Sequence, residues 1–397
     1  MTLDPSNNHD LMLQLFEVLN ANHSDGIRSL LEGILNAAMK MEREKALQAK
    51  PYERNPERQG YANGFKTRNF NTRMGTLEIQ IPQVRGISFY PQCLEKGSRS
   101  ERALKVAVAE MYLKGVSTRK VESITQALCG LEFTSTQVSR ATKELDEEFE
   151  LFRNRLLGTF TYVFLDAIYL KVRHNGSVID QSVLIAYGIN EKGTREILGA
   201  STSLSEAEIH WRSFLESLLK RGLNGVELII SDDHVGLRKA RQKVFPSIPW
   251  QRCQFHMSQN AQSYAPRQSL KKDIAIAMRE IFNTTNFQSA RQKIEEIIGI
   301  FSKSAPEFCK WLEMNVEEGL TCLNFQRSHQ RRKRTTNGLE RVNREIKRRT
   351  RVAVLFPNAE SALRLVTGVL IEIHEEWITQ RKYLEISEEI EKMEKVG

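Results

Sequence analysis

The sequence lacks the features of secreted and membrane proteins. Its 397 residues include only 5 cysteines, an odd and scattered set, which argues against a disulfide framework. The first residues, MTLDPSNNHD, contain neither a basic region nor an apolar stretch, so we expect no signal peptide. No apolar run approaches the roughly 20 residues that a membrane-spanning helix requires. We therefore expect a cytoplasmic protein without a membrane partner.

Positive charge is in excess and is unevenly distributed. The chain has 58 Lys and Arg against 49 Asp and Glu, a formal net charge of +9. Mild basicity favours a polyanionic partner such as nucleic acid but does not identify one. Basic side chains concentrate in one segment, residues 331–358, which reads RRKRTTNGLERVNREIKRRTRVAVLFPN.

This basic segment predicts an amphipathic helix. We expect Asn337 to cap it, with Glu340 at the third position of a capping box. The helix should end near Arg351, ahead of Pro357. An apolar stripe for packing would be formed by Leu339, Val342 and Ile346.

Glu340 is an isolated carboxylate on a basic helix face. At 100° per residue it shares that face with Arg344, Lys347 and Arg351. One interpretation is a helix cap with an ion pair from Glu340 to Arg344. The other is a metal-binding carboxylate within a surface that holds nucleic-acid phosphates. The choice depends on the rest of the chain.

The pattern of apolar segments predicts an α/β fold. Three antiparallel strands are followed by helix, strand, helix and strand, which is the order of a ribonuclease-H-like core with a mixed sheet and helices on both faces. An all-helical insertion should follow the last strand. The strands are expected at residues 161–173, 178–190, 194–202, 226–231 and 248–255.

Mainly helical segments with a small β subdomain precede this core, and we expect them to bind DNA. Two helices separated near Gly130 resemble a helix-turn-helix, with Arg140 and Lys143 on the possible recognition helix; a plain helical hairpin is the alternative. The expected boundaries are a helical segment at 1–50, a basic β-rich subdomain at 51–100, a helical DNA-binding segment at 101–157, the core at 158–265 and 328–380, the insertion at 266–327 and a charged tail at 381–397.

The small β subdomain should contain a half-buried strand. Leu77, Ile79 and Ile81 alternate with Glu78 and Gln80, and Pro82 is expected at the exit of the strand.

Local turn and cap signals refine these N-terminal segments. Asp25-Gly26 is expected to separate two helices. In the helix-turn-helix, Ser117 should cap the first helix, and Ser135 or Thr136 the second.

Three acidic positions could converge in such a core. Asp166 interrupts the apolar strand FLDAIYL, where a charge is costly unless it is paired or binds a metal; a structural aspartate held by backbone donors is the alternative. Asp232 and Asp233 follow a buried strand, at the sheet edge where ligand sites gather, although either could also cap a helix. With Glu340 they would offer hard oxygen ligands suited to Mg²⁺ or Mn²⁺. Two such ions can promote phosphodiester displacement.

Five segments together carry a resemblance to a known family. They are NGF…GTLEIQIP…RG at 63–86, FLDAIYLKVR at 164–173, SDDHVGLRKA at 231–240, WQRCQFHMSQN at 250–260 and TTNGLERVNREIKRRTRV at 335–352. In these segments the chain resembles bacterial insertion-sequence transposases related to the Mutator elements. The resemblance implies a catalytic and metal-binding triad of Asp166, Asp232 and Glu340. Asp233 remains an alternative, because the family usually has Ser-Asp-Ala-His there.

The resemblance also implies a function and partners. The protein would bind the terminal inverted repeats of its element, which are double-stranded DNA. It would cleave them with Mg²⁺ or Mn²⁺, and the family's pattern implies two ions. It would then join the 3′-hydroxyl ends to target DNA by strand transfer. Because an element has two ends to be processed, the resemblance implies at least a homodimer on DNA. It also implies association with the nucleoid. Alternatives are a DNA-binding regulator without catalysis and a ribonuclease-H-like nuclease without strand transfer.

Other residues are expected to contact DNA. Cys253 and His256 match the Cys-x-x-His signature of the family; taken alone they are half of a zinc site, or a DNA-contacting pair. Phosphates would be positioned by a basic set on the predicted helix, namely Arg341, Arg344, Lys347 and Arg348.

Overall fold

The computed structural model describes residues 23–94, 96, 100–351 and 355–386, and the chain divides into two compact units, Met1–Leu145 and Asp146–Gly397. The division precedes the boundary expected after residue 157. The reason is helix α6 (Asp146–Asn154), whose Asp146 forms a two-pronged ion pair with Arg364 at 2.6 and 2.8 Å. This contact joins α6 to the second unit.

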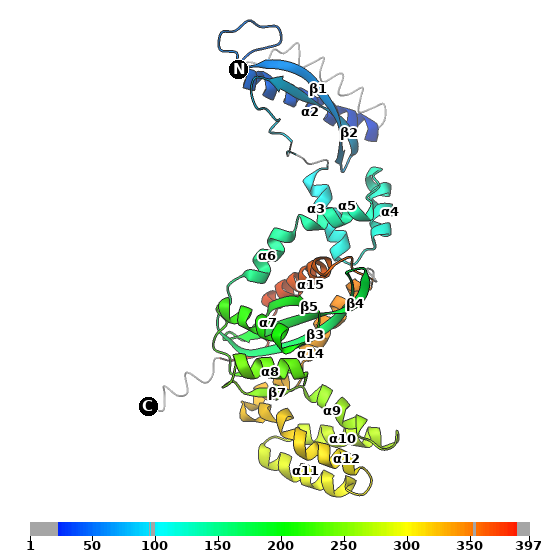
Figure 1. The fold of residues 1–397 in the computed structure, drawn as a ribbon, viewed down its shortest axis with the longest axis vertical. Helices are drawn as coiled ribbons and strands as arrows, with labels where there is room; N and C mark the ends of the chain where they lie inside the picture. Colours follow the sequence, from blue (N-terminus) through cyan, green and yellow to red (C-terminus); the bar gives the residue numbers. More distant parts are fainter. Residues whose placement is uncertain (1–22, 95, 97–99, 352–354, 387–397) are drawn as a thin grey trace, which may run out of the picture. The chain divides into compact units, whose positions relative to one another are not determined.

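The first unit contains a helix on a two-stranded antiparallel ribbon (Figure 1). These elements are α2 (His23–Leu47), β1 (Tyr61–Thr72) and β2 (Gly75–Arg85). Leu77, Ile79 and Ile81 are buried and alternate with exposed residues, as predicted. Strand β2 continues past Pro82, which is opposite the irregular end of β1, where a missing N–H is tolerated. Helix α2 runs through Asp25-Gly26, so the expected break there is wrong; the helix expected before it lies outside the described residues.

Three short helices complete the first unit. They are α3 (Arg102–Leu113), α4 (Thr118–Cys129) and α5 (Ser135–Lys143), packed around a shared apolar cluster. Ser117 caps α4 as expected, and Gly130 ends it at φ +66°, a conformation that favours glycine. The cap of α5 is Thr134 in a capping box with Gln137, so the expected Ser135 or Thr136 was wrong.

The second unit is a mixed α/β structure built on a five-stranded sheet in the order β5-β4-β3-β6-β7 (Figure 1). Strands β3, β4 and β5 are antiparallel neighbours, whereas β6 and β7 run parallel to β3. The strands are β3 (Phe160–His174), β4 (Ser177–Asn190), β5 (Arg195–Ser203), β6 (Leu228–Ser231) and β7 (Trp250–Arg252). This arrangement is compatible with the expected ribonuclease-H-like core.

Helices cover both faces of the sheet. Side chains alternate along β3, so its apolar residues point to both faces and each face packs against helices. Val163 and Leu165 pack with Trp211 and Leu237 of the helices on one face. On the other face, Tyr187 stacks on Phe164. The helices are α7 (Glu208–Lys220) and α8 (Val235–Val244) on the first face, and α14 (Asn337–Thr350) and α15 (Ala359–Thr379) on the second. Asp166 lies two residues after Phe164, so its side chain is on the same face of the sheet and faces α14.

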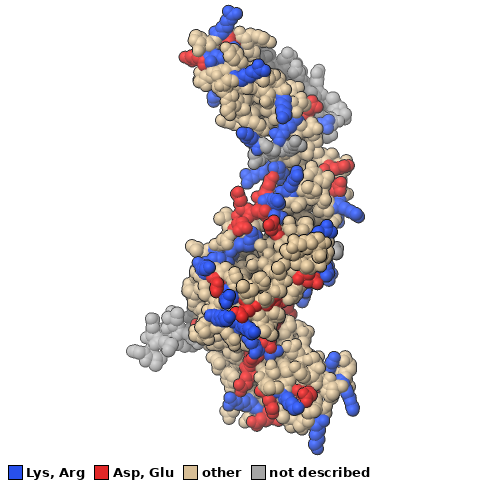
Figure 2. Space-filling model, viewed as in Figure 1, with Lys and Arg blue, Asp and Glu red and all other residues tan. Residues whose placement is uncertain are grey.

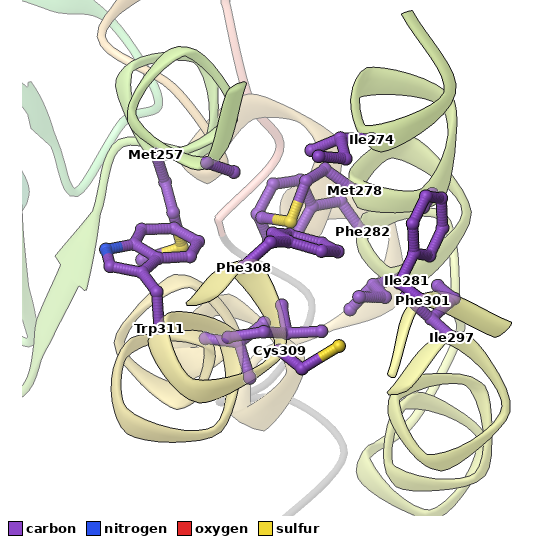
Figure 3. Packing of buried hydrophobic residues seen from close by; sticks show 14 of the residues in the cluster. Met257, Ile274, Met278, Ile281, Phe282, Ile297, Phe301, Phe308, Cys309 and Trp311 are labelled. Atoms are coloured by element: carbon purple, nitrogen blue, oxygen red, sulfur yellow. The ribbon is translucent and has the colours of Figure 1, made fainter. Parts of the chain in front are cut away.

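A helical region connects β7 to α14 and has its own apolar core (Figure 3). Its elements are α9 (Gln254–Ser263), α10 (Leu270–Phe282), α11 (Phe287–Phe301), α12 (Pro306–Asn315), the 3₁₀ helices η1 (Val316–Gly319) and η2 (Thr321–Asn324), and α13 (Arg327–Lys333). Trp311 lies in this core beside Met257 and stacks on Tyr264, which assigns it a packing role. Within the described ranges, no helix is long and apolar enough to cross a membrane.

Candidate active site

A cavity of about 740 Å³ opens at the edge of the sheet where β3 and β6 lie side by side. Three of the predicted site residues, Asp166, Asp232 and Glu340, line it together. The remaining lining side chains come from β3, the loop after β5, α9 and α14: Ala167, Ile168, Tyr169, Glu206, Phe255, His256, Asn343, Arg344, Lys347, Arg348 and Arg351.

The two aspartates are brought together by strand register. Phe164 of β3 is paired with Ile230 of the parallel strand β6. Asp166 and Asp232 each lie two residues beyond this pair, so both emerge at the same edge. Neighbouring parallel strands place the residues at their carboxyl ends side by side. For this reason Asp166 and Asp232 lie close together although they are far apart in the sequence.

Asp166 is a carboxylate in an unfavourable environment. It is only 8% exposed. Burial, followed by the negative charge of Asp232, raises its pKa to about 7, although hydrogen bonds from the Ala167 N–H at 2.9 Å and the Asn343 amide at 2.8 Å oppose the rise. A buried anion beside a second anion favours either a proton or a bound cation.

This raised pKa predicts an effect of pH on the metal-free protein. A folded-state pKa above the unfolded value means that Asp166 stabilises the fold at low pH and that this stability is lost as the pH rises from about 4 through 7. Asp166→Asn removes the charge. In EDTA at pH 8 the variant should therefore be more stable than wild type, by up to roughly 4 kcal/mol.

Thermal unfolding in EDTA at pH 8 and at pH 5 measures this difference. The advantage of Asp166→Asn should shrink at the lower pH, because the wild-type carboxyl becomes protonated in the fold. Asp180→Asn, on an exposed ion pair of β4 with Lys171, is the matched control and should show little change at either pH. A variant less stable than wild type at pH 8 would contradict the assignment.

Glu340 does not act as a helix cap in the structure. The N-cap of α14 is Thr336 and not Asn337, and no side-chain capping bond is present, so the predicted capping box is wrong. The physical reason is that the Thr336 hydroxyl is engaged by the Cys253 sulfur at 3.4 Å. Glu340 and Arg344, both described, form no ion pair, and Oε1 of Glu340 is buried with no hydrogen-bond partner among the described residues. The carboxylate is therefore available to a ligand in the cavity.

The rest of the α14 prediction is confirmed. The helix ends at Thr350, and the stripe of Leu339, Val342 and Ile346 is buried. This packing turns the neighbouring face of α14, which carries Glu340 and Asn343, toward the cavity.

Asn343 is a site residue that sequence reasoning missed. It lies three residues after Glu340, on the same helix face, and its amide donates a hydrogen bond to Oδ2 of Asp166. This contact links α14 directly to β3 and orients the aspartate. Its spacing from Glu340 was the signal that could have identified it.

Asp232 and Asp233 have different surroundings. Asp232 lines the cavity, and burial followed by the charge of Glu206 raises its pKa. Asp233 points away and pairs with Arg238 at 2.6 Å and with the buried Arg252 at 3.1 Å. Neither caps α8, whose N-cap is His234. The geometry thus supports Asp232 as the site carboxylate and gives Asp233 a structural role.

Cys253 and His256 occupy different environments, although only three positions apart. Cys253 is fully buried and accepts hydrogen bonds from the backbone N–H and the hydroxyl of Thr336, so in this conformation it has no surface for the expected DNA contact. Its role is to join the start of α9 to the start of α14. His256 lines the cavity, and its pKa is raised to about 9, mainly by the Cys253 side chain and also by Asp232 and Asp166. The two carboxylates thus favour the protonated form of this imidazole.

The basic residues predicted on α14 divide into two groups. Arg344, Lys347 and Arg348 line the cavity, as does Arg351. Arg341 does not; it pairs with Glu376 of α15 at 3.3 Å. On the face drawn in Figure 2, basic and acidic side chains are interspersed over the described surface, so charge alone does not mark a DNA-binding face there. The lining of the cavity is the more specific indicator.

In the first unit, α5 has the properties of a recognition helix. Arg140 and Lys143 are exposed, together with Gln137 and Ser139. Val138 on the opposite side is buried in the three-helix cluster. The polar face of α5 is therefore exposed, as the prediction of a recognition helix requires.

The donor set around the cavity fits hard divalent cations. Among residues that the structure describes, no three His, Cys, Asp or Glu side chains are gathered closely enough to form a ready metal site. The carboxylates instead surround a common space, and Glu340 Oε1 lacks a partner there. Carboxylate oxygens suit Mg²⁺ or Mn²⁺, and positive charge would offset the repulsion between Asp166 and Asp232.

Comparison with known proteins identifies the family of the chain. The chain matches the family described as Transposase, Mutator family over residues 6–380. It is 50% identical over 371 residues to the transposase for insertion sequence element IS406 of Burkholderia multivorans, which covers 93% of this chain and 96% of that protein. Identity is 40% over 368 residues to the ISRM5 transposase of Rhizobium meliloti (92% of each chain), and 38% over 365 residues to the IS256 transposase in Tn4001 of Staphylococcus aureus (91% and 93%). The chain belongs to the Mutator family of transposases.

Proposed function

We propose that this protein is an insertion-sequence transposase whose ribonuclease-H-like core cuts and joins DNA through an acidic triad of Asp166, Asp232 and Glu340. The observation that carries the proposal is the common cavity of the three carboxylates, bordered by the basic face of α14. Carboxylates and cations side by side are what a phosphodiester-processing site requires.

The triad would hold Mg²⁺ or Mn²⁺. When bound, two such ions supply an activated oxygen nucleophile and stabilise the oxygen that leaves the phosphodiester. The chain itself orients the ligands. Asn343 holds Asp166 through its amide at 2.8 Å, and the Cys253–Thr336 contacts set the start of α14 and thereby the position of Glu340.

His256 and the α14 cations would act on the DNA. The protonated imidazole of His256 can donate a hydrogen bond to a phosphate oxygen that enters the cavity. Arg344, Lys347 and Arg351 can hold neighbouring phosphates. Attack of water on a phosphodiester at the element end would free a 3′-hydroxyl. In strand transfer this hydroxyl would attack a phosphodiester of the target, forming the new bond while the target strand leaves through its own 3′-hydroxyl.

The first unit would recognise the element ends. Its α5 exposes Arg140 and Lys143 on a polar face, next to a three-helix core of the helix-turn-helix type. Since an element has two ends that must be processed together, we propose that the protein works as at least a dimer on DNA.

The test is incubation with labelled double-stranded DNA that carries the element's inverted repeats, with Mg²⁺ or Mn²⁺. Nicking at the repeat end and joined products are the expected results. Binding without either product would point to a DNA-binding regulator. Nicking without joining would point to a nuclease, and both outcomes would contradict the proposal.

Lys347→Gln should weaken DNA binding uniformly across sequences. Lys347 is exposed and lines the cavity, so its loss removes one phosphate contact. The slope of log K against log salt should fall in magnitude by about 0.9. Lys310→Gln, which alters an exposed lysine paired with Glu307 on α12, is the control. An unchanged slope for Lys347→Gln would exclude a phosphate contact at this position.

A further inference from the structure

A fourth carboxylate lines the cavity, and neither sequence pattern nor the triad accounts for it. Glu206 lies in the loop between β5 and α7, and its carboxylate shares the cavity with Asp166, Asp232 and Glu340. It is only 9% exposed. Burial of an anion is costly unless a partner compensates it, so its surroundings require an explanation.

The neighbours of Glu206 do not neutralise it. The Tyr169 hydroxyl hydrogen-bonds to it. Nδ1 of His234 lies 3.6 Å from Oε2, but this nitrogen accepts a hydrogen bond from the Gly236 N–H at 3.3 Å. An accepting nitrogen carries no proton, so His234 offers Glu206 no hydrogen there. Among the described residues, Glu206 forms no ion pair with a lysine or an arginine.

The position of Glu206 depends on close backbone packing. A Cβ atom added to Gly236, in the first turn of α8, would lie 2.0 Å from the Glu206 carbonyl oxygen. Glycine therefore allows the loop to approach the helix that follows Asp232. The loop is thereby held against the start of α8, a few residues after Asp232.

We propose that Glu206 is a fourth carboxylate ligand of the metal centre, acting with Asp232 on one of the two ions. This inference rests on the proposed function. Each Mg²⁺ or Mn²⁺ ion prefers six oxygen ligands, and three carboxylates divided between two ions leave many positions to water. A buried carboxylate without a cation, from a separate loop, supplies a further hard oxygen donor at the required place.

Binding of Mn²⁺ to the metal-free protein, without DNA, tests the proposal independently of activity. The free-ion signal in electron paramagnetic resonance is followed during titration of wild type, Glu206→Gln, Glu206→Asp and Asp166→Asn. Glu206→Gln should weaken one Mn²⁺ site by about tenfold or more, and Glu206→Asp should weaken it less, because the shorter side chain keeps the charge. Glu208→Gln is the matched control: Glu208 is two residues away and pairs with Lys243 outside the cavity, so binding should match wild type.

The outcomes separate this inference from the function on which it rests. Suppose that wild type binds two ions, that Asp166→Asn binds them more weakly or not at all, and that both Glu206 variants bind like wild type. This result would overturn only the role of Glu206 and would leave the proposed function standing. Wild type that binds no Mn²⁺ would overturn the metal-dependent function and the fourth ligand with it. Should Glu206→Gln fail to fold, Glu206→Asp decides: wild-type affinity in that variant overturns the proposal, and weaker binding supports it.

Discussion

Asp166→Asn is expected to abolish nicking and joining of element-end DNA while leaving DNA binding intact. The substitution keeps the size of the side chain. Its amide oxygen can still accept the hydrogen bond from the Ala167 N–H, and its NH₂ group can donate to the Asn343 side-chain oxygen once the Asn343 amide rotates. It removes the charge that would hold a divalent cation at the centre of the cavity. Loss of about 4 kcal/mol of transition-state stabilisation corresponds to a rate reduction of roughly 10³-fold.

Cleavage rate and DNA affinity should be measured on the same preparations. Asp180→Asn is the matched control, because Asp180 is an exposed aspartate on the adjacent strand β4, paired with Lys171 outside the cavity. Its rate should remain within about twofold of wild type. An Asp166→Asn variant that cuts at the wild-type rate would remove this residue from the active site.

Asp232→Asn and Asp233→Asn should have opposite effects. Asp232 lines the cavity, so its amide variant should lose cleavage by about 10³-fold, as Asp166→Asn does. Asp233 instead pairs with Arg238 and with Arg252, which is only 3% exposed. Asp233→Asn should destabilise the fold by about 1–2 kcal/mol and leave most of the activity, because Arg252 keeps Glu318 as a partner at 3.2 Å.

Single-turnover cleavage and thermal unfolding together distinguish these roles. For Asp233→Asn, a midpoint lowered by a few degrees with near-normal cleavage below that temperature is expected. If Asp233→Asn abolishes cleavage at full stability while Asp232→Asn remains active, the second carboxylate of the triad has been assigned to the wrong residue.

Features set by local patterns were predictable. The alternation around Leu77 and Ile79 predicted a half-buried strand, and the spacing of Leu339, Val342 and Ile346 predicted the buried stripe of α14. Both follow from the repeat of the backbone itself, which relates neighbours in sequence to one face in space. Strand order was predictable for a related reason, since few topologies suit three antiparallel strands followed by two parallel ones.

Competition between distant partners was not predictable. Asn337 and Glu340 form a good capping box in sequence, but α14 has Thr336 at its N-cap and no side-chain capping bond. The Thr336 hydroxyl is instead bonded to the buried Cys253, which no local rule connects to it. Helix α5 is capped by Thr134 for a subtler reason: several adjacent residues could cap it, and only Thr134 has Gln137 three residues ahead, which completes a capping box.

The sequence by itself determined the family, the order of the strands, the apolar stripe of α14 and the presence of an aspartate within an apolar strand. The tertiary structure alone decided which of Asp232 and Asp233 lines the cavity, and it added Asn343 and Glu206 to the lining. The reason is physical: periodicity specifies which face a residue occupies on its own element. Periodicity does not specify whether a carboxylate pairs with an arginine or remains without a cation. These contacts depend on side chains that only the folded chain brings together.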